Sequence, residues 1–211
     1  MTIEARLRPR KQPRQHRAWE TRGRILVAAA RVFARYGYAA GTTNRIAEEA
    51  RLSVGSLYQY FPNKDAILVE LMNAHVEEGA RLVTEAFADI PEDVSALPLP
   101  ALVRPFVRAA LRNHAGDPAL HRVLFEEAPR PASFLERMRA LEADLVTRVE
   151  GLLNRHPAVG VTDRHLAAWT AVATVESLTH RYVAAHPAVL DADGFEDELT
   201  RLVVAYLRAE A

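Results

Sequence analysis

The chain has 211 residues, of which 49% are hydrophobic, so it is long enough for one all-helical domain or two small ones around a buried core. It has no cysteine and no run near the roughly 18 apolar residues of a membrane span, which excludes disulfides and thiolate metal sites and suits a cytoplasmic protein. The net charge is zero, but residues 1–64 hold 13 Lys and Arg against 4 Asp and Glu, whereas residues 65–211 hold 14 against 23. A basic front part joined to an acidic remainder indicates that the front part binds a polyanion.

The beginning of the chain predicts a basic arm followed by a helix. Residues 1–18 contain Pro9, Pro13 and six basic residues and predict a mobile arm, with a disordered solubilising tail as the alternative. A helix is expected over residues 21–36, because apolar residues recur there on one helical face. Gly37 suits the carboxyl cap of that helix.

Residues 42–63 carry the most informative pattern, which is a pair of short helices. Ile46 and Ala50 share a face of one helix, and Leu57 and Phe61 share a face of the next. This arrangement is typical of a helix-turn-helix. Its second helix is short and polar on its outer face, so it suits a DNA major groove.

Single residues indicate where these two helices begin and end. Thr43 is expected to cap the first helix and Ser53 the second, because a side-chain hydroxyl accepts a hydrogen bond from an unpaired backbone N–H. Pro62 and Asn63 end the second helix, since the residue before a proline is disfavoured in helical geometry.

The rest of the chain also predicts helices, without convincing strand alternation. A long helix is expected from Lys64 to about Ala88, followed by a linker that contains Pro91, Pro98 and Pro100. Five more helices are expected at about residues 101–114, 117–128, 132–155, 163–186 and 195–209. We therefore expect an all-α fold of about nine helices. Its expected parts are a flexible arm, a helix-turn-helix domain, a connecting helix and a carboxyl-terminal domain, at residues 1–18, 19–64, 65–90 and 91–211.

The segment from Thr21 to Glu77 has a specific order of residues within the helix pair. Thr-x-x-Ile-Ala is followed by Ser-x-Gly-Ser-Leu-Tyr-x-Tyr-Phe-x-x-Lys. In this order the segment resembles the TetR family of transcriptional regulators. The resemblance implies a homodimer that places one recognition helix per subunit in successive major grooves of a palindromic operator, about 34–36 Å apart. It also implies a carboxyl-terminal domain that binds a small-molecule effector.

The resemblance assigns DNA contacts residue by residue. The implied phosphate contacts are Thr43, Tyr58, Tyr60 and Lys64. The implied base contacts are Asn44, Arg45, Ser56 and Gln59. Gly55 lets the backbone approach the DNA closely. The whole expected surface comprises Thr43, Asn44, Arg45, Ser53, Val54, Gly55, Ser56, Tyr58, Gln59, Tyr60 and Lys64.

One position in the turn departs from the family pattern. The family usually has glycine there, whereas this chain has Arg51. If the backbone is left-handed at this position, Arg51 costs about 1 kcal/mol relative to glycine. A contact from Arg51 to a phosphate would offset part of that cost.

The carboxyl-terminal domain has apolar stripes that suit a dimer. The two last helices have more apolar surface than one small domain needs, so an intermolecular four-helix bundle is expected, with purely internal packing as the alternative. The expected interface residues are Ala171, Val175, Leu178, Tyr182, Leu199, Leu202, Val203 and Tyr206.

Other side chains of that domain suit an effector pocket, although at helical spacing they are equally ordinary core residues. The expected lining is Phe106, Phe125, Phe134, Met138, Trp169, Glu176 and His180. Glu176 and His180 are one turn apart, a spacing that can bind a metal or fix a polar ligand, with a simple i,i+4 interaction as the alternative.

The leading hypothesis is a sequence-specific DNA-binding repressor that a small-molecule effector releases from its operator. An effector-independent regulator or an activator is the alternative. A helical enzyme that uses Glu176 and His180 with His114 or His165 is a remote one, because no nucleophile–base pair or metal cluster has diagnostic spacing. We expect no catalytic site, metal, cofactor or membrane partner.

Overall fold

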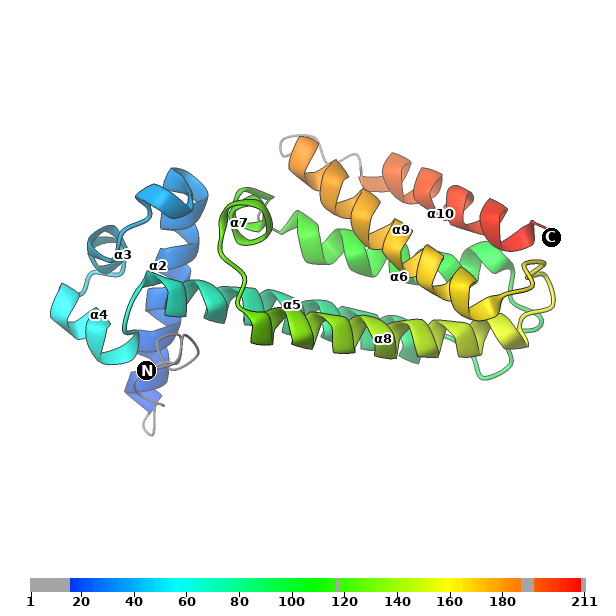
Figure 1. Ribbon diagram of the computed structural model, residues 1–211, viewed down its shortest axis with the longest axis horizontal. Coiled ribbons are helices and arrows are strands. Elements are labelled where there is room, and N and C mark those ends of the chain that lie inside the picture. The colour runs from blue at the N-terminus through cyan, green and yellow to red at the C-terminus, as the bar shows by residue number, and fades with distance from the viewer. Residues whose placement is uncertain (1–15, 117, 187–191, 210–211) are drawn as a thin grey trace. The chain divides into compact units, whose positions relative to one another are not determined.

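The computed structural model describes residues 16–116, 118–186 and 192–209, and all regular structure within these ranges is helical (Figure 1). These residues form nine α-helices and one π-helical segment. The predicted all-α class is therefore confirmed. The arm predicted over residues 1–18 lies almost wholly outside the described residues. Within the described ranges, no helix is long and apolar enough to cross a bilayer.

The described residues divide into two compact units. The first takes the described residues up to Val76 together with those from α7 (Pro118–Arg122) to Glu136. The second takes Glu77–Gly116 and the described residues after Glu136. Helix α5 (Lys64–Ala88) contributes to both units. The segment from α7 to Glu136, which the sequence assigns to the carboxyl-terminal domain, thus groups with the amino-terminal helices.

The first unit contains α2 (His16–Ala40), α3 (Thr43–Glu49) and α4 (Val54–Tyr60), besides the beginning of α5. Its fully buried large side chains include Ile25, Phe33, Ile46, Leu57, Phe61, Ile67, Leu68 and Met72. Gly37 has φ 72° and ψ 174°, so the regular part of α2 ends where the sequence predicts a carboxyl cap. The two short helices of the predicted helix-turn-helix follow.

Helix α7 continues directly into the π-helical segment η1 (Val123–Glu127), and both pack against α2 in the first unit. The N–H of Ala128 donates to the carbonyl of Val123 at 3.0 Å, which is the i→i+5 bond of a π-turn. The sequence predicts one helix over this region. A π-turn adds a single residue to one turn and barely changes the spacing of apolar residues, so the pattern does not reveal it.

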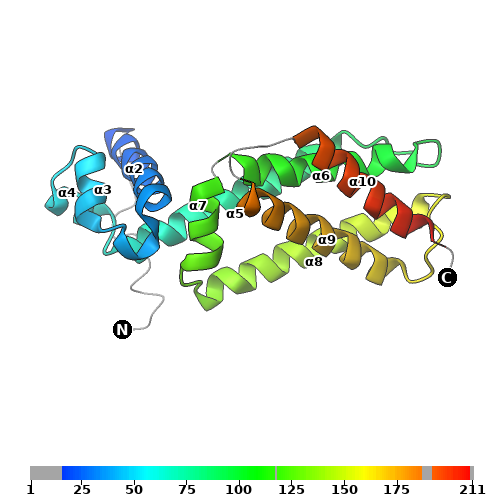
Figure 2. The same cartoon turned by 90° about the horizontal axis from the view of Figure 1, so that it is seen from above.

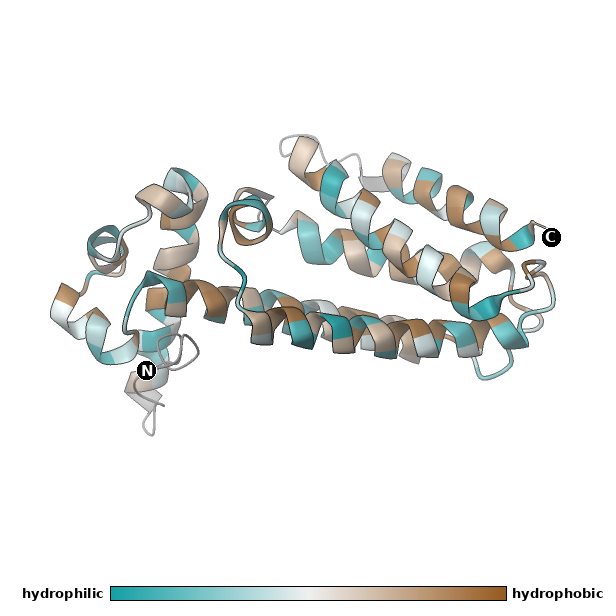
Figure 3. Cartoon of the chain, viewed as in Figure 1, coloured by the Kyte–Doolittle hydropathy of each residue, from teal (hydrophilic) through white to brown (hydrophobic). Residues whose placement is uncertain are grey.

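The second unit is built on α6 (Leu99–Ala115), α8 (Ala132–Arg155), α9 (Arg164–Ala185) and α10 (Ala192–Arg208). Helices α6, α9 and α10 lie side by side in both views (Figures 1 and 2). Along α10, hydrophobic and hydrophilic bands alternate with the helical turn (Figure 3), as a helix with one buried face requires. The core includes Leu102, Val107, Leu111, Leu153, Ala167, Ala168, Leu199 and Leu207.

All four helices begin and end within one turn of the bounds predicted for them. The start of α9 has a local cause, because the Asp163 carboxylate accepts a hydrogen bond from the N–H of Leu166 at 2.9 Å. Asp163 is therefore the N-cap of α9.

One buried carboxylate connects α10 to α6. Glu196 is 6% exposed and accepts hydrogen bonds from Arg108 Nη2 at 2.8 Å, Arg108 Nε at 3.1 Å and Arg104 Nη1 at 3.1 Å. Burial alone raises the pKa of the Glu196 carboxyl, but the hydrogen bonds from Arg108 and Arg104 outweigh burial and hold this pKa below its ordinary value.

Replacing Glu196 with Gln should lower the free energy of unfolding at pH 7 by about 1–2 kcal/mol, because charge-assisted hydrogen bonds are lost. A carboxyl whose folded pKa is lowered stabilises the protein above its unfolded pKa of about 4.3, and this contribution is lost as the pH falls through the folded pKa. The difference between wild type and E196Q in urea unfolding should therefore shrink on acidification below about pH 4.3. A constant difference would contradict this assignment. E198Q, which removes an exposed ion pair with Arg201, is the matched control and should change stability little.

Candidate nucleic-acid interface

Helices α3 and α4 each begin at a capping hydroxyl. Ser53 caps α4 as predicted, since its Oγ accepts a hydrogen bond from the N–H of Ser56 at 3.1 Å. The prediction for α3 is wrong by one residue. Thr42, with extended backbone geometry, is the cap, and its Oγ1 accepts from the N–H of Arg45 at 3.4 Å. Two adjacent threonines offer the same hydroxyl, so the sequence does not distinguish which one leaves the helix.

The turn between the two helices is left-handed at Arg51, which has φ 54°. The N–H of Arg51 donates to the carbonyl of Glu48 at 3.0 Å, and the N–H of Leu52 donates to that of Ala47 at 2.9 Å. These bonds close the end of α3 in the manner expected when the residue after a helix is left-handed. The backbone condition considered for Arg51 is therefore fulfilled, and its cost relative to glycine stays a prediction.

The side of α3 and α4 that faces solvent is polar. Asn44, Gly55, Tyr58 and Gln59 are exposed, while Ser56 is half-buried. The hydroxyls of Thr43 and Tyr58 lie 3.2 Å apart and so connect the start of α3 to the middle of α4. Two hydroxyls this close can both bind oxygens of one phosphate group, because each hydroxyl can donate one hydrogen bond.

The two cations expected to contact DNA are held by backbone carbonyls at the end of α2. Lys64 Nζ donates to the carbonyls of Tyr38 and Ala39 at 2.8 and 3.3 Å and lies 4.0 Å from the centroid of the Tyr38 ring. Arg45 Nη1 donates to the carbonyl of Ala40 at 2.7 Å, and its guanidinium lies 4.4 Å from the centroid of the Tyr36 ring. Each keeps further N–H donors, since an ammonium has three and a guanidinium five.

A hydrogen bond also connects Tyr38, near the end of α2, to the start of α5. The Tyr38 hydroxyl donates to the Asp65 carboxylate at 2.6 Å. Burial, and after it the hydrogen bond and the negative charge of Asp65, raise the pKa of Tyr38 well above its ordinary value, so the phenol stays protonated and remains a donor.

Two basic residues of α2 make structural contacts that the sequence does not predict. Arg24 Nη2 donates to the carbonyl of Ala50 at 2.6 Å, at the carboxyl end of α3 where a cation is favoured. Arg22 forms an ion pair with Glu70 of α5. Because both are arginines in a generally basic segment, nothing in the sequence separates them from residues that contact a polyanion.

The residues expected to line an effector pocket belong to both units. Phe125 and Phe134 belong to the first unit, whereas Phe106, Met138, Trp169, Glu176 and His180 belong to the second. Trp169 is 49% exposed and Glu176 is also exposed. In the second unit, the carboxylate of Glu176 lies 3.6 Å from Nε2 of the buried His114, and the His180 ring lies 6.0 Å from the His114 ring. Their contact with a ligand remains a prediction.

The residues expected at the dimer interface differ in their exposure. Ala171 on α9 and Leu199 and Val203 on α10 are buried in the core of their own unit, and the interface assigned to them stays a prediction. Val175 and Tyr206 pack partly against that core, and Tyr182 is also half-buried. The exposed members are Leu178 and Leu202.

A different row on α9 forms a shallow apolar depression. Its lining residues are Trp169, Thr170, Ala173, Thr174, Ser177 and Leu178. Helical periodicity gives two candidate stripes on α9, and only the packing of α6 and α10 determines which of them is covered.

Two family profiles match the chain. Residues 25–71 match the bacterial regulatory proteins of the tetR family, and residues 98–207 match the tetracyclin repressor-like carboxyl-terminal domain. Among curated relatives, the transcriptional repressor SCO4008 of Streptomyces coelicolor is 30% identical over 51% of this chain and 49% of its own length. The transcriptional activator FasR of Mycolicibacterium smegmatis is 29% identical over 63% of this chain and 62% of its own length. The alignments thus span less than two thirds of these relatives.

Solved structures share the fold over nearly the whole chain. FadR from Bacillus subtilis, in complex with stearoyl-CoA, is similar with a TM-score of 0.64 and 20% identity, over 87% of this chain and 98% of the other. At this identity the likeness concerns the fold alone.

Replacing Arg51 with Gly should raise the free energy of unfolding by about 1 kcal/mol, because glycine adopts the left-handed conformation without a Cβ penalty. The change is measured by urea or thermal unfolding. Arg35→Gly, at an exposed position inside α2, is the matched control and should lower stability by about 1 kcal/mol. If R51G were also destabilising, Arg51 would hold the turn through a contact stronger than its backbone strain.

Proposed function

Since the chain belongs to the TetR family of DNA-binding transcriptional regulators, we propose that it is a homodimeric repressor that a small-molecule effector releases from a palindromic operator. The observation that carries this proposal is the solvent-facing surface of α3 and α4, where hydroxyl, amide and guanidinium groups gather. The net charge of residues 1–64, with 13 basic against 4 acidic side chains, supports a polyanionic partner.

Phosphates are bound by groups at both ends of the helix pair. The adjacent hydroxyls of Thr43 and Tyr58, together with Tyr60, donate to phosphate oxygens, and the remaining N–H of Lys64 does the same. Such contacts set the position of the protein on the duplex without recognising a sequence.

Base edges are contacted from the exposed face. Gln59 on α4 pairs with adenine through its side-chain amide. Ser56 accepts or donates a hydrogen bond at a neighbouring base edge, and Asn44 approaches the bases from α3. Arg45 pairs with guanine once its guanidinium has turned from the Ala40 carbonyl toward the major groove. Gly55 and the capped start of α4 at Ser53 and Val54 let the backbone lie close to the duplex.

A second copy of the chain covers the exposed apolar row of α9. Trp169 is 49% and Leu178 38% exposed there, and Leu202 on α10 is 50% exposed. Apolar side chains this exposed on two neighbouring helices mark an interaction surface. Covering them in a two-fold symmetric dimer supplies two recognition helices, as a palindromic operator requires.

The effector acts by binding the DNA-incompetent state more tightly than the competent one. A coupling of about 1–3 kcal/mol gives about a 5- to 150-fold change in operator affinity. Because the similar FadR structure contains stearoyl-CoA, long-chain acyl-CoA thioesters are the first probes. An activator is the second candidate, favoured by the similarity to FasR, which is named an activator. Transcription in the presence and absence of the protein separates the two.

Fluorescence anisotropy on the DNA beside the protein's own gene tests DNA binding. Wild-type affinity should fall steeply with salt, because bound phosphates release counterions. Tyr58→Phe should weaken binding to specific and random DNA alike, since it removes a phosphate contact. Gln59→Ala should relax the preference at one base position by about 1–3 kcal/mol. Salt-independent binding, or equal effects of both substitutions on both DNAs, would contradict the proposal.

Introducing a charge in the exposed apolar row should prevent dimer formation. Leu178→Glu together with Leu202→Glu should yield folded monomers with poor operator affinity, because a buried unpaired carboxylate is costly. Light scattering gives the mass and circular dichroism the helix content. Leu141→Glu, on α8 at an exposed position, is the control and should leave the mass unchanged. A normal dimer of the double variant would refute this interface.

A further inference from the structure

We infer that Glu127, the last residue of η1, is a positioning residue for DNA binding. Its carboxylate holds the turn formed by Gly37–Ala40, and that turn holds Arg45 and Lys64. Glu127 itself touches no DNA. The inference rests on the proposed function, since it assumes that Arg45 and Lys64 contact the operator.

The backbone at Gly37 admits no other residue. With φ 72° and ψ 174° it lies in a region that only glycine adopts readily. A Cβ at this position would also lie 2.9 Å from Glu127 Oε2. Glycine is thus required for two reasons. It adopts this backbone conformation, and it leaves room for the Glu127 carboxylate to approach.

The chain leaves the helix at Gly37, and the polar backbone groups of the turn then find partners outside α2. The N–H of Tyr38 donates to Glu127 Oε2 at 3.0 Å. The carbonyls of Tyr38 and Ala39 accept from Lys64. A single carboxylate therefore fixes one side of a turn whose other side binds a DNA-contacting cation.

The Arg45 side chain binds the same turn, at the carbonyl one residue after Ala39. Its Nη1 donates to the carbonyl of Ala40 at 2.7 Å, while the turn closes through the N–H of Gly41, which donates to the carbonyl of Gly37 at 3.0 Å. Movement of the turn would therefore displace the anchors of both cations together.

Glu127 is itself held in place within the first unit. Arg122 pairs with its carboxylate at 3.2 Å, and Val123 and Leu124 of η1 are buried. The ring of His121 on α7 stacks on Phe125 with centroids 4.6 Å apart. Buried side chains of α7 and η1 thus fix the backbone from which Glu127 extends.

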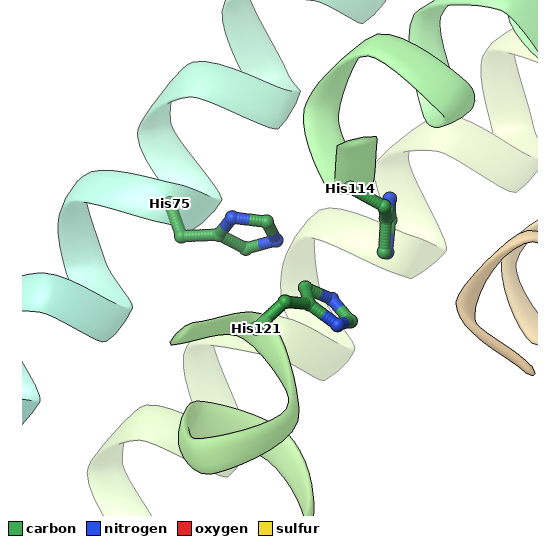
Figure 4. Close-up of side chains that lie close together, drawn as sticks. All are labelled: His75, His114 and His121. Carbon is green, nitrogen blue, oxygen red and sulfur yellow. The ribbon is translucent and has the colours of Figure 1, made fainter. Parts of the chain in front are cut away.

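The histidine of α7 also meets α5. The rings of His75 and His121 point toward each other from α5 and α7 (Figure 4), with centroids 5.1 Å apart. His114, also labelled in Figure 4, is on α6 in the second unit, where its Nδ1 lies 2.8 Å from the carbonyl of Ala110. Within the first unit, α7 therefore packs against α2 and contacts α5 through the His121 and His75 rings, and these contacts hold the backbone from which Glu127 extends to the Gly37–Ala40 turn.

Replacing Glu127 with Ala should weaken operator binding by roughly tenfold, because a charge-assisted hydrogen bond that orders the turn is lost and Arg45 and Lys64 are less well ordered before binding. Glu127→Gln retains an acceptor for the Tyr38 N–H and should stay within about threefold of wild type. Glu126→Ala, at the exposed neighbour that takes no part in the turn, is the matched control and should bind as wild type does.

Double-variant cycles separate positioning from a general loss of stability. In a background of Arg45→Ala with Lys64→Ala, the further change E127A should cost about twofold or less, because nothing remains for the turn to position. Binding is measured by anisotropy at a temperature where circular dichroism shows every variant folded. Wild-type affinity for E127A, an E127Q defect as large as that of E127A, or a full E127A effect in the double-variant background would overturn the inference. Absence of wild-type DNA binding would instead refute the proposed function.

Discussion

The Gly37–Ala40 turn is the constraint on which the DNA-facing half of the protein depends. At this turn α2 ends in a backbone conformation available only to glycine, and its N–H and carbonyl groups are left for partners outside the helix. Glu127 takes the N–H of Tyr38, while Lys64 and Arg45 take the carbonyls that follow. Three segments far apart in the sequence are thus joined at one point by polar contacts.

This arrangement explains why the first unit extends beyond the helix-turn-helix itself. The helix pair α3 and α4 is too short to be stable alone, and isolated helices of this length are marginal in water. Helix α3 packs on α2 and on α4, and α7 and η1 also pack against α2. The polar outer surface is left to solvent, where an operator can reach it.

Helix caps and turns that depend on residues close in sequence could be predicted. Ser53 and Gly37 act through their own backbone or through residues three positions away, and the cap and the helix end predicted for them are confirmed, while Arg51 has a left-handed backbone. Thr42 and Thr43 offer the same hydroxyl, so the sequence could not choose between them. The helix bounds follow from periodicity, since one face of each helix is buried.

Contacts between distant segments could not be predicted in this way. Nothing near Arg45 in the sequence indicates that its guanidinium donates to the carbonyl of Ala40. Likewise, nothing near Glu127 indicates that its carboxylate accepts from the N–H of Tyr38. On α9 the two apolar stripes are equivalent in the sequence, and the packing of α6 and α10 decides that Ala171 is buried and Trp169 exposed. The DNA contacts themselves stay predictions, because they depend on a partner that the chain does not contain.

In the proposed homodimer, two copies of the α3–α4 surface bind one operator together. Hydroxyl-radical footprinting of the wild-type protein, on the DNA beside its own gene, tests this arrangement. Two protected blocks related by a palindrome are expected, with centres about 34–36 Å apart, one helical turn or a multiple of it. Uniform cleavage, or protection confined to a single unpaired block, would contradict it.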